Sequence, residues 1–167
     1  MNKTLDLCVL RDEDTGKFGY IGDADDWAIK PIFDLAREFY EGLALVELDG
    51  KWGYINPDGD WAFDARFDDA GCFVNGLAGV KVDGKWGFID KSGDVIIEPK
   101  YDYVGAFFND YAKVKLNGKY GFINRFGEPI GEIIYDYLEY FRDGKAVADL
   151  DDKRGYLDRK GEWHEEV

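Results

Sequence analysis

Residues that could carry out chemistry are few in this 167-residue chain. His164 is the single histidine, and it lies beside Glu165 and Glu166 near the C-terminal end. A general base needs a positioned partner, and a structural zinc site needs four His or Cys ligands. One histidine and two distant cysteines, Cys8 and Cys72, meet neither requirement, and no nucleotide-binding or nucleophile motif is present. We therefore predict no catalytic residue, no metal and no cofactor, and expect both thiols to be reduced.

Acidic residues gather in three stretches that invite a calcium-binding interpretation. The stretches are DEDTG at 12–16, DADD at 23–26 and NPDGD at 56–60. None has the spaced oxygen ligands and closing glutamate of a calcium loop. Asp, Asn and Gly are also the residues that tight turns require. We therefore interpret all three stretches as turns.

The net charge of −14 is concentrated in the first two fifths of the chain. Residues 1–42 hold 5 basic against 10 acidic residues, and residues 43–76 hold 2 against 7. Such a field repels nucleic acid and anionic membranes and attracts basic protein surfaces. High solubility is the simpler interpretation of the same charge. For a dedicated binding face, the candidate partner-binding residues are Asp12, Asp14, Asp23, Asp25, Asp26, Asp58, Asp60, Trp27 and Trp61.

An internal repeat of 34 residues places these side chains. Its period is set by Gly19, Gly53, Gly87, Gly121 and Gly155. Apolar residues recur in register at Ile21, Ile55, Ile89, Ile123 and Leu157, and aromatic residues at Phe33, Phe67, Tyr101 and Tyr135. We assign five units, at about 5–42, 43–76, 77–110, 111–144 and 145–167, within one domain that spans residues 1–167.

Two further rows of residues have alternative interpretations. The acids Asp34, Asp68, Asp102 and Asp136 could form a ladder for a basic partner, or could each cap a short turn of their own connector. We favour capping, since it explains both the residue type and its place. The tryptophans Trp27, Trp61 and Trp163 share one position with Val95 and Pro129. Such a row could bind sugars, although packing is the usual role of aromatic rings.

The local sequence code is β. Asp49-Gly50, Asp83-Gly84 and Asn117-Gly118 are the dipeptides of two-residue type I′ hairpins. This turn predicts that Val46 pairs with Gly53, where the missing side chain leaves room for a close neighbour. A short third strand follows, and we expect Pro31 and Pro99 to end it. The connector that completes each unit could hold one helical turn, with residues 34–39 the best candidate.

The segments GKWGYI at 50–55 and GKWGFID at 84–90 resemble the core of the WG-repeat family of bacterial proteins. The segments PKYD at 99–102 and FVNGLAGV at 73–80 resemble the second half of that repeat. The outer units depart from the pattern, with Phe18, Tyr120 and Arg154 in place of Trp. An arginine in the last unit suits a terminal cap facing water. The resemblance implies a β-repeat interaction protein without catalytic residues.

We therefore predict an all-β protein of five tandem three-stranded antiparallel meanders in an open stack or superhelix, with a closed five-bladed ring as the alternative. The expected function is non-catalytic binding of a protein with a basic surface, for instance as an inhibitor or immunity-type protein. A glycan-binding or cell-wall-binding module is the alternative. We expect no nucleic acid or membrane partner, and a cytoplasmic location because the N-terminal residues do not form a signal sequence.

Overall fold

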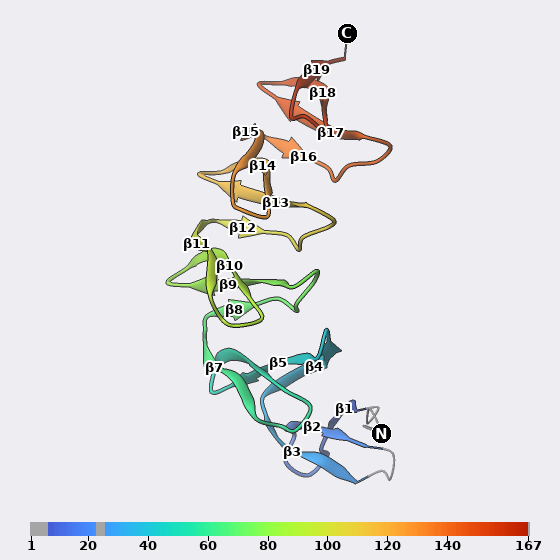
Figure 1. Ribbon diagram of the computed structural model, residues 1–167, viewed down its shortest axis with the longest axis vertical. Coiled ribbons are helices and arrows are strands. Elements are labelled where there is room, and N and C mark those ends of the chain that lie inside the picture. Colours follow the sequence, from blue (N-terminus) through green and yellow to red (C-terminus); the bar gives the residue numbers. More distant parts are fainter. Residues whose placement is uncertain (1–6, 23–25, 167) are drawn as a thin grey trace.

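The computed structural model describes residues 7–22 and 26–166, and all regular structure in these ranges is β. Its nineteen antiparallel strands form five sheets, which Figure 1 shows stacked in an open column with β1–β3 and β17–β19 at opposite ends. The strands are β1 (Cys8–Arg11), β2 (Phe18–Ile21), β3 (Trp27–Phe33), β4 (Leu35–Tyr40), β5 (Leu43–Leu48), β6 (Lys51–Ile55), β7 (Trp61–Phe67), β8 (Asp69–Ala70), β9 (Leu77–Val82), β10 (Lys85–Asp90), β11 (Val95–Tyr101), β12 (Tyr103–Val104), β13 (Tyr111–Leu116), β14 (Lys119–Asn124), β15 (Pro129–Tyr135), β16 (Tyr137–Leu138), β17 (Lys145–Leu150), β18 (Lys153–Asp158) and β19 (Trp163–Glu165). The predicted all-β class and the open stack of repeats are therefore confirmed, and the sheets do not close into a ring.

Each sheet after the first has four strands because the connector of one unit supplies the first strand of the next. The orders are β4-β5-β6-β7, β8-β9-β10-β11, β12-β13-β14-β15 and β16-β17-β18-β19. Ala70 pairs with Val80, for example, and Val104 with Val114. The predicted three-stranded meanders are present, and the connector adds a fourth strand to each sheet after the first. The sequence units and the sheets do not coincide, because every connector belongs to one unit and pairs with the next.

The predicted helical turn at residues 34–39 is wrong, since Leu35–Tyr40 forms strand β4. The backbone N–H groups of this segment have partners across the sheet; that of Asp34 donates to the Glu47 carbonyl at 2.9 Å. Once an extended connector can pair with the neighbouring hairpin, a single turn of helix has no advantage.

The prolines do not end the third strands as predicted. β3 and β11 run through Pro31 and Pro99 to Phe33 and Tyr101. The pairing of β10 with β11 shifts register between Trp86 and Phe88, next to this proline. A proline without an N–H donor is tolerated at such an irregularity.

The hairpin turns have the predicted geometry. Asp83 and Gly84 have φ of 49° and 78°, and the other two predicted turns are alike. The expected pairing of Val46 with Gly53 is also present, with Ala44 opposite Ile55. In the last unit Asp151 and Asp152 adopt the same positive φ values, 50° and 63°, without a glycine. Type I′ geometry thus fixes one register in these hairpins.

The hydrophobic core runs through the units and across the joints between them. One cluster joins Phe88 and Ile97 to Ala112 and Ile123 of the following unit. A second joins Tyr54 and Phe67 to Val80 and Ile89. Most of the residues predicted in register are buried, among them Ile55, Ile89, Ile123, Leu157, Phe33, Phe67, Tyr101 and Tyr135. A unit therefore completes its core by packing against its neighbours, as in other repeat proteins.

The central glycine of each unit lies against the last strand of its sheet. A Cβ at Gly87 would lie 2.3 Å from the Ile97 carbonyl oxygen and 2.7 Å from the Pro99 nitrogen. The other four glycines meet comparable atoms, so the predicted close neighbour is present. That neighbour is backbone, which cannot rotate away as a side chain could.

We predict that Gly87→Ala destabilises the protein by about 3 kcal/mol, because the paired strands β10 and β11 must separate to admit the methyl group. Urea unfolding measures this change. Gly71→Ala is the matched control, since its Cβ would meet nothing closer than 3.8 Å. Equal stabilities for the two variants would show that the close crossing does not constrain the fold.

Candidate functional site

The connector aspartates, Asp34, Asp68, Asp102 and Asp136, each bind two neighbouring hairpins. One carboxylate oxygen of Asp102 accepts from the Lys85 ammonium at 2.6 Å, and the other accepts from the Gly118 N–H at 3.2 Å. Lys85 belongs to the hairpin before the aspartate and Gly118 to the turn of the hairpin after it. The same two contacts recur at the other three aspartates. Each carboxylate therefore ties one unit to the next.

Both sequence-based interpretations of this row need correction. The carboxylates do accept backbone N–H groups, but from the turn of the next hairpin and not from their own connector. They are not a ladder free for a partner, because each is already paired with a lysine. The hydrogen bond from Lys85, followed by that from Gly118, holds the pKa of Asp102 below its usual value of 3.8. The pKa values of Asp34, Asp68 and Asp136 are lowered by the equivalent lysines.

A second row of acids is exposed at the turn before each third strand. This turn-acid row consists of Asp26, Asp60, Asp94, Glu128 and Glu162, one residue per unit. In every unit but the first, a preceding Asn or Asp orders the turn: Asn56 accepts the N–H groups of Asp58 and Asp60 through its side chain, both at 3.0 Å. The Asp60 carbonyl accepts from the Asn56 N–H at 2.9 Å, and the Asp60 residue is exposed. In the fourth unit the Glu128 carboxylate accepts from the Asn124 side chain at 2.7 Å.

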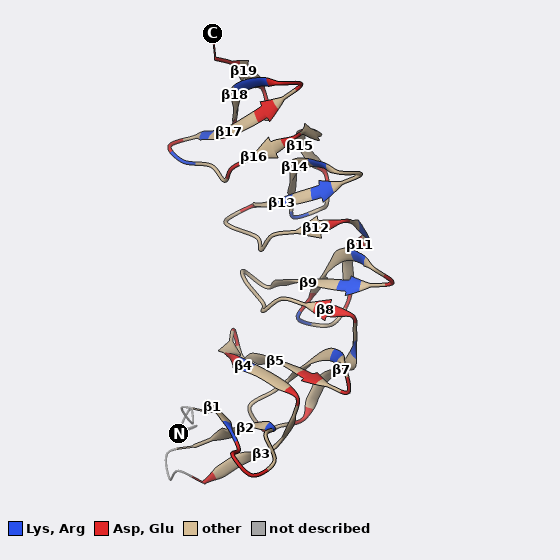
Figure 2. Cartoon of the chain, turned by 180° about the vertical axis from the view of Figure 1, so that it is seen from behind, with Lys and Arg blue, Asp and Glu red and all other residues tan. Residues whose placement is uncertain are grey.

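The turns of successive units lie one above another, which aligns the turn-acid row along the column. A Cβ on the turn residue Gly59 would meet Ile29 of the preceding unit at 3.3 Å, and one on Gly127 would meet Ile97 at the same distance. Asp60 and Asp94 form no ion pair with another described residue. Figure 2 shows acidic segments recurring in the turns and loops along the whole column.

The predicted partner-binding acids do not all share this position. Asp26 and Asp60 belong to the turn-acid row, and Asp58 is exposed at the tip of the same turn as Asp60. Asp12 instead orders the first hairpin by accepting from the Thr15 N–H at 2.7 Å and hydroxyl at 2.6 Å, which lowers its pKa. Asp14 is exposed in that turn, whereas Asp23 and Asp25 lie outside the described residues.

The tryptophan row is partly buried by packing. Trp61 is 37% exposed and meets Phe33 edge-on, with 5.9 Å between ring centroids. Trp27 is half-buried, and Trp163 packs against Tyr135 at 5.6 Å. The intervening Val95 is 51% exposed and offers no ring. These rings therefore do not form a continuous aromatic platform.

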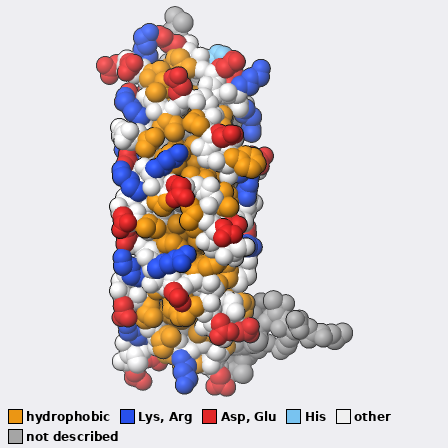
Figure 3. Space-filling model, turned by 60° about the vertical axis from the view of Figure 1, so that its left-hand side comes forward, with side chains coloured by type: hydrophobic (Ala, Val, Ile, Leu, Met, Phe, Trp, Pro, Cys, Tyr) orange, Lys and Arg blue, Asp and Glu red, His pale blue; other side chains and the backbone are white. Residues whose placement is uncertain are grey.

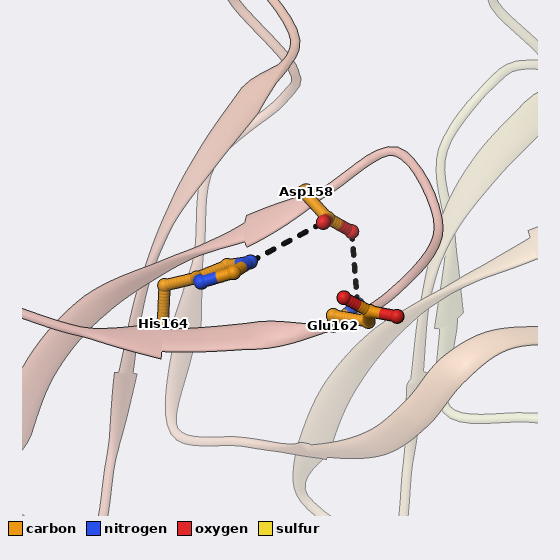
Figure 4. Close-up of side chains that lie close together, drawn as sticks. All are labelled: Asp158, Glu162 and His164. Atoms are coloured by element: carbon orange, nitrogen blue, oxygen red, sulfur yellow. Dashed lines mark hydrogen bonds and ion pairs between the residues drawn. The ribbon is translucent and has the colours of Figure 1, made fainter.

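His164 belongs to a small polar cluster at the last unit. Its Nε2 atom lies 3.2 Å from an oxygen of Asp158, and its ring stacks on Tyr156 with centroids 4.8 Å apart. The other oxygen of Asp158 accepts from the N–H groups of Lys160 and Glu162 (Figure 4). The ligand atoms of Asp158, Glu162 and His164 lie within 4.8 Å of one another, which the sequence did not predict. Asp158 nevertheless has the turn-ordering role that Asn56 has in the second unit.

An apolar hollow of 180 Å³ opens between the third and fourth sheets. Its walls include Gly71 and Cys72 from one connector, Val104 and Ala106 from the next, and Trp86 from β10. Burial raises the pKa of the Cys72 thiol.

Figure 3 shows hydrophobic side chains running up the middle of one face of the column, with charged side chains beside and between them.

The fold and its repeating contacts define an elongated β-repeat protein in which each sheet packs on the next. The model of the WG containing repeat matches residues 18–52, 52–86, 86–120 and 120–153. The chain therefore belongs to the WG-repeat family. No curated protein matches the chain. None of the described residues forms a helix long and apolar enough to cross a membrane.

We predict that the contacts of the connector aspartates make stability depend on acid pH. Their pKa values are lowered on folding, so their contribution is complete above the usual value of 3.8 and is lost as the pH falls through the lower folded value. The fourfold Asp→Asn variant at 34, 68, 102 and 136 should therefore melt below the wild type at pH 6. The difference should shrink below pH 3.8.

Thermal melts at several pH values test this expectation. Asp110→Asn with Asp143→Asn is the control, because neither residue forms an ion pair with another described residue. A gap between the fourfold variant and the wild type that stays constant across this pH range would contradict the proposed linkage.

Proposed function

We propose that this protein is a non-catalytic module that binds a protein partner with a basic surface. The observation that carries the proposal is the turn-acid row, which repeats one exposed carboxylate per unit along the column. A linear row of like charges suits an extended basic surface, and its field speeds the encounter with such a partner. Inhibition of that partner, as by an immunity-type protein, is one role that this binding would serve.

The internal pairing of lysines supports the same proposal. Lys17, Lys51, Lys85 and Lys119 are held by the connector aspartates at 2.5–2.6 Å, and Lys91 is held by Glu41 at 3.0 Å. These cations are therefore not available to neutralise the turn-acid row. The acids of the row are part of the net charge of −14 that the chain carries.

The exposed apolar side chains add contact area to the charge. Leu35, Tyr103 and Tyr137 share one repeat position and are 42%, 43% and 45% exposed. Apolar side chains surrounded by charged ones are typical of surfaces that bind other proteins. Tyrosine is among the residues enriched in such interfaces.

We predict that neutralising the turn-acid row weakens partner binding far more than the same change of charge elsewhere. A partner isolated from source-cell lysate at low ionic strength would be titrated against Asp60→Asn with Asp94→Asn. We expect a loss of about tenfold, the typical scale of two partly screened charge contacts. High salt should weaken the wild-type complex in the same direction.

Asp110→Asn with Asp143→Asn is the control, with an equal change of net charge in the turns that close the units. We expect this pair to change affinity by less than about threefold, since only the general field is altered. Equal losses for the two pairs, or a complex insensitive to salt, would refute the proposal.

A further inference from the structure

The hollow between the third and fourth sheets has a counterpart one unit further along, and there the protein fills it. Each wall residue has an equivalent 34 positions later: Gly71 corresponds to Gly105, Val74 to Phe108, Gly79 to Lys113 and Ala106 to Tyr140. Comparing the hollow with these later positions therefore shows which kind of side chain fits between the connector and the hairpin at this place in the repeat.

Tyr140 occupies the later position with its whole ring. Its hydroxyl oxygen lies 2.4 Å from the place that a Cβ on Gly105 would take. Its ring meets Phe108 edge-on at 5.7 Å, and the Lys113 ammonium lies 4.5 Å from the ring centroid. The ring of Tyr140 is thus contacted by Gly105, Phe108 and Lys113. Their equivalents at the hollow are Gly71, Val74 and Gly79.

In the third unit the same place is empty of side chains. Ala106 stands where Tyr140 would be, and Gly79 stands where Lys113 would be. A Cβ on Gly71 would meet only the Gly79 carbonyl oxygen, at 3.8 Å. One unit earlier, the buried side chain of Leu45 stands at the position of Gly79. The hollow is therefore a gap beside Ala106 and Gly71, because Val104 Cγ2 already lies 2.9 Å from the place that a Cβ on Gly79 would take.

We propose that the hollow receives a tyrosine side chain of the protein partner, in the place that Tyr140 occupies in the next unit. The inference rests on the proposed function and identifies the anchor of that interaction. The volume of 180 Å³ suits one side chain, since pockets for whole small molecules usually span about 300–1,000 Å³. Gly71, Cys72 and Val74 belong to residues 43–76, which hold 2 basic against 7 acidic residues, so basic residues flanking the tyrosine on that side suit this part of the chain.

Two synthetic peptides test the anchor: Lys-Lys-Gly-Tyr-Gly-Lys-Lys and the same peptide with alanine in place of tyrosine. In low salt we expect the tyrosine peptide to bind about tenfold more tightly, the effect of burying one aromatic ring. It should also shift the NMR signals of the Gly71 and Gly79 amides and of the Trp86 indole. The alanine peptide should leave these signals in place.

Ala106→Tyr provides the decisive variant, because it rebuilds the arrangement of Tyr140 and fills the hollow with the protein's own ring. The affinity of this variant for the tyrosine peptide should fall to that for the alanine peptide. Ala62→Tyr, which adds the same side chain at another exposed alanine, should bind both peptides as the wild type does. Thermal melts establish that each variant is folded, and the wild-type NMR shifts decide the question should Ala106→Tyr not fold.

The outcomes separate this inference from the proposed function. Equal, salt-sensitive binding of both peptides to the wild type would overturn the tyrosine anchor and leave the acidic binding surface standing. No binding of either peptide would overturn both. A tyrosine preference that survives Ala106→Tyr, or that shifts no signal at Gly71, Gly79 or Trp86, would place the anchor elsewhere and overturn the inference.

Discussion

The donation of a connector strand from each unit to the next is the constraint on which this structure depends. The pairing of Ala70 with Val80 and of Val104 with Val114 means that no sheet after the first is complete within its own unit. The connector aspartates reinforce the same joint, since each carboxylate is bound by a lysine before it and a turn N–H after it. Shared cores then follow from shared sheets, because the apolar faces of each hairpin meet the neighbouring units. The column is stabilised by contacts between successive sheets, and no contact is needed between its two ends.

In this mode of assembly, many residues on the lateral surface are not needed to hold the units together. The residues that the repeat requires are the central glycines, the turn dipeptides, the core aromatic residues and the connector aspartates. Between them lie positions that change from unit to unit, such as Gly79 against Lys113 and Ala106 against Tyr140. A repeated scaffold can therefore carry a unique feature in one unit without altering the fold of the others. The hollow beside Trp86 is such a feature, and the turn-acid row is its regular counterpart.

Much of the fold could be predicted because its signals are local. Positive φ at Asp83 and Gly84 follows from the Asp-Gly dipeptide, and the register of Val46 with Gly53 follows from the two-residue turn. The donated strands could not be predicted in this way, since the pairing partner of residues 34–39 lies in the next unit and the segment has no strand-like alternation. The candidate binding surface is less predictable from the sequence than the fold. The acidic charge of the first units predicts Asp26 and Asp60 as binding residues. Their alignment with Asp94 and Glu128 along the column appears in the sequence only as a 34-residue spacing. The hollow exists because small side chains leave space between two sheets, and a sequence pattern does not show such empty space directly.

Small-angle X-ray scattering of the protein in solution tests the open, nearest-neighbour column most directly. An open column has many short distances across its width and few long ones along its axis. Its pair-distance distribution should therefore peak early and decline in a long tail that matches the curve calculated from the structure (Figure 1). A symmetric, bell-shaped distribution with a much shorter maximum distance would show that the units close on themselves. That result would contradict the continuous lateral surface on which both the turn-acid row and the tyrosine anchor depend.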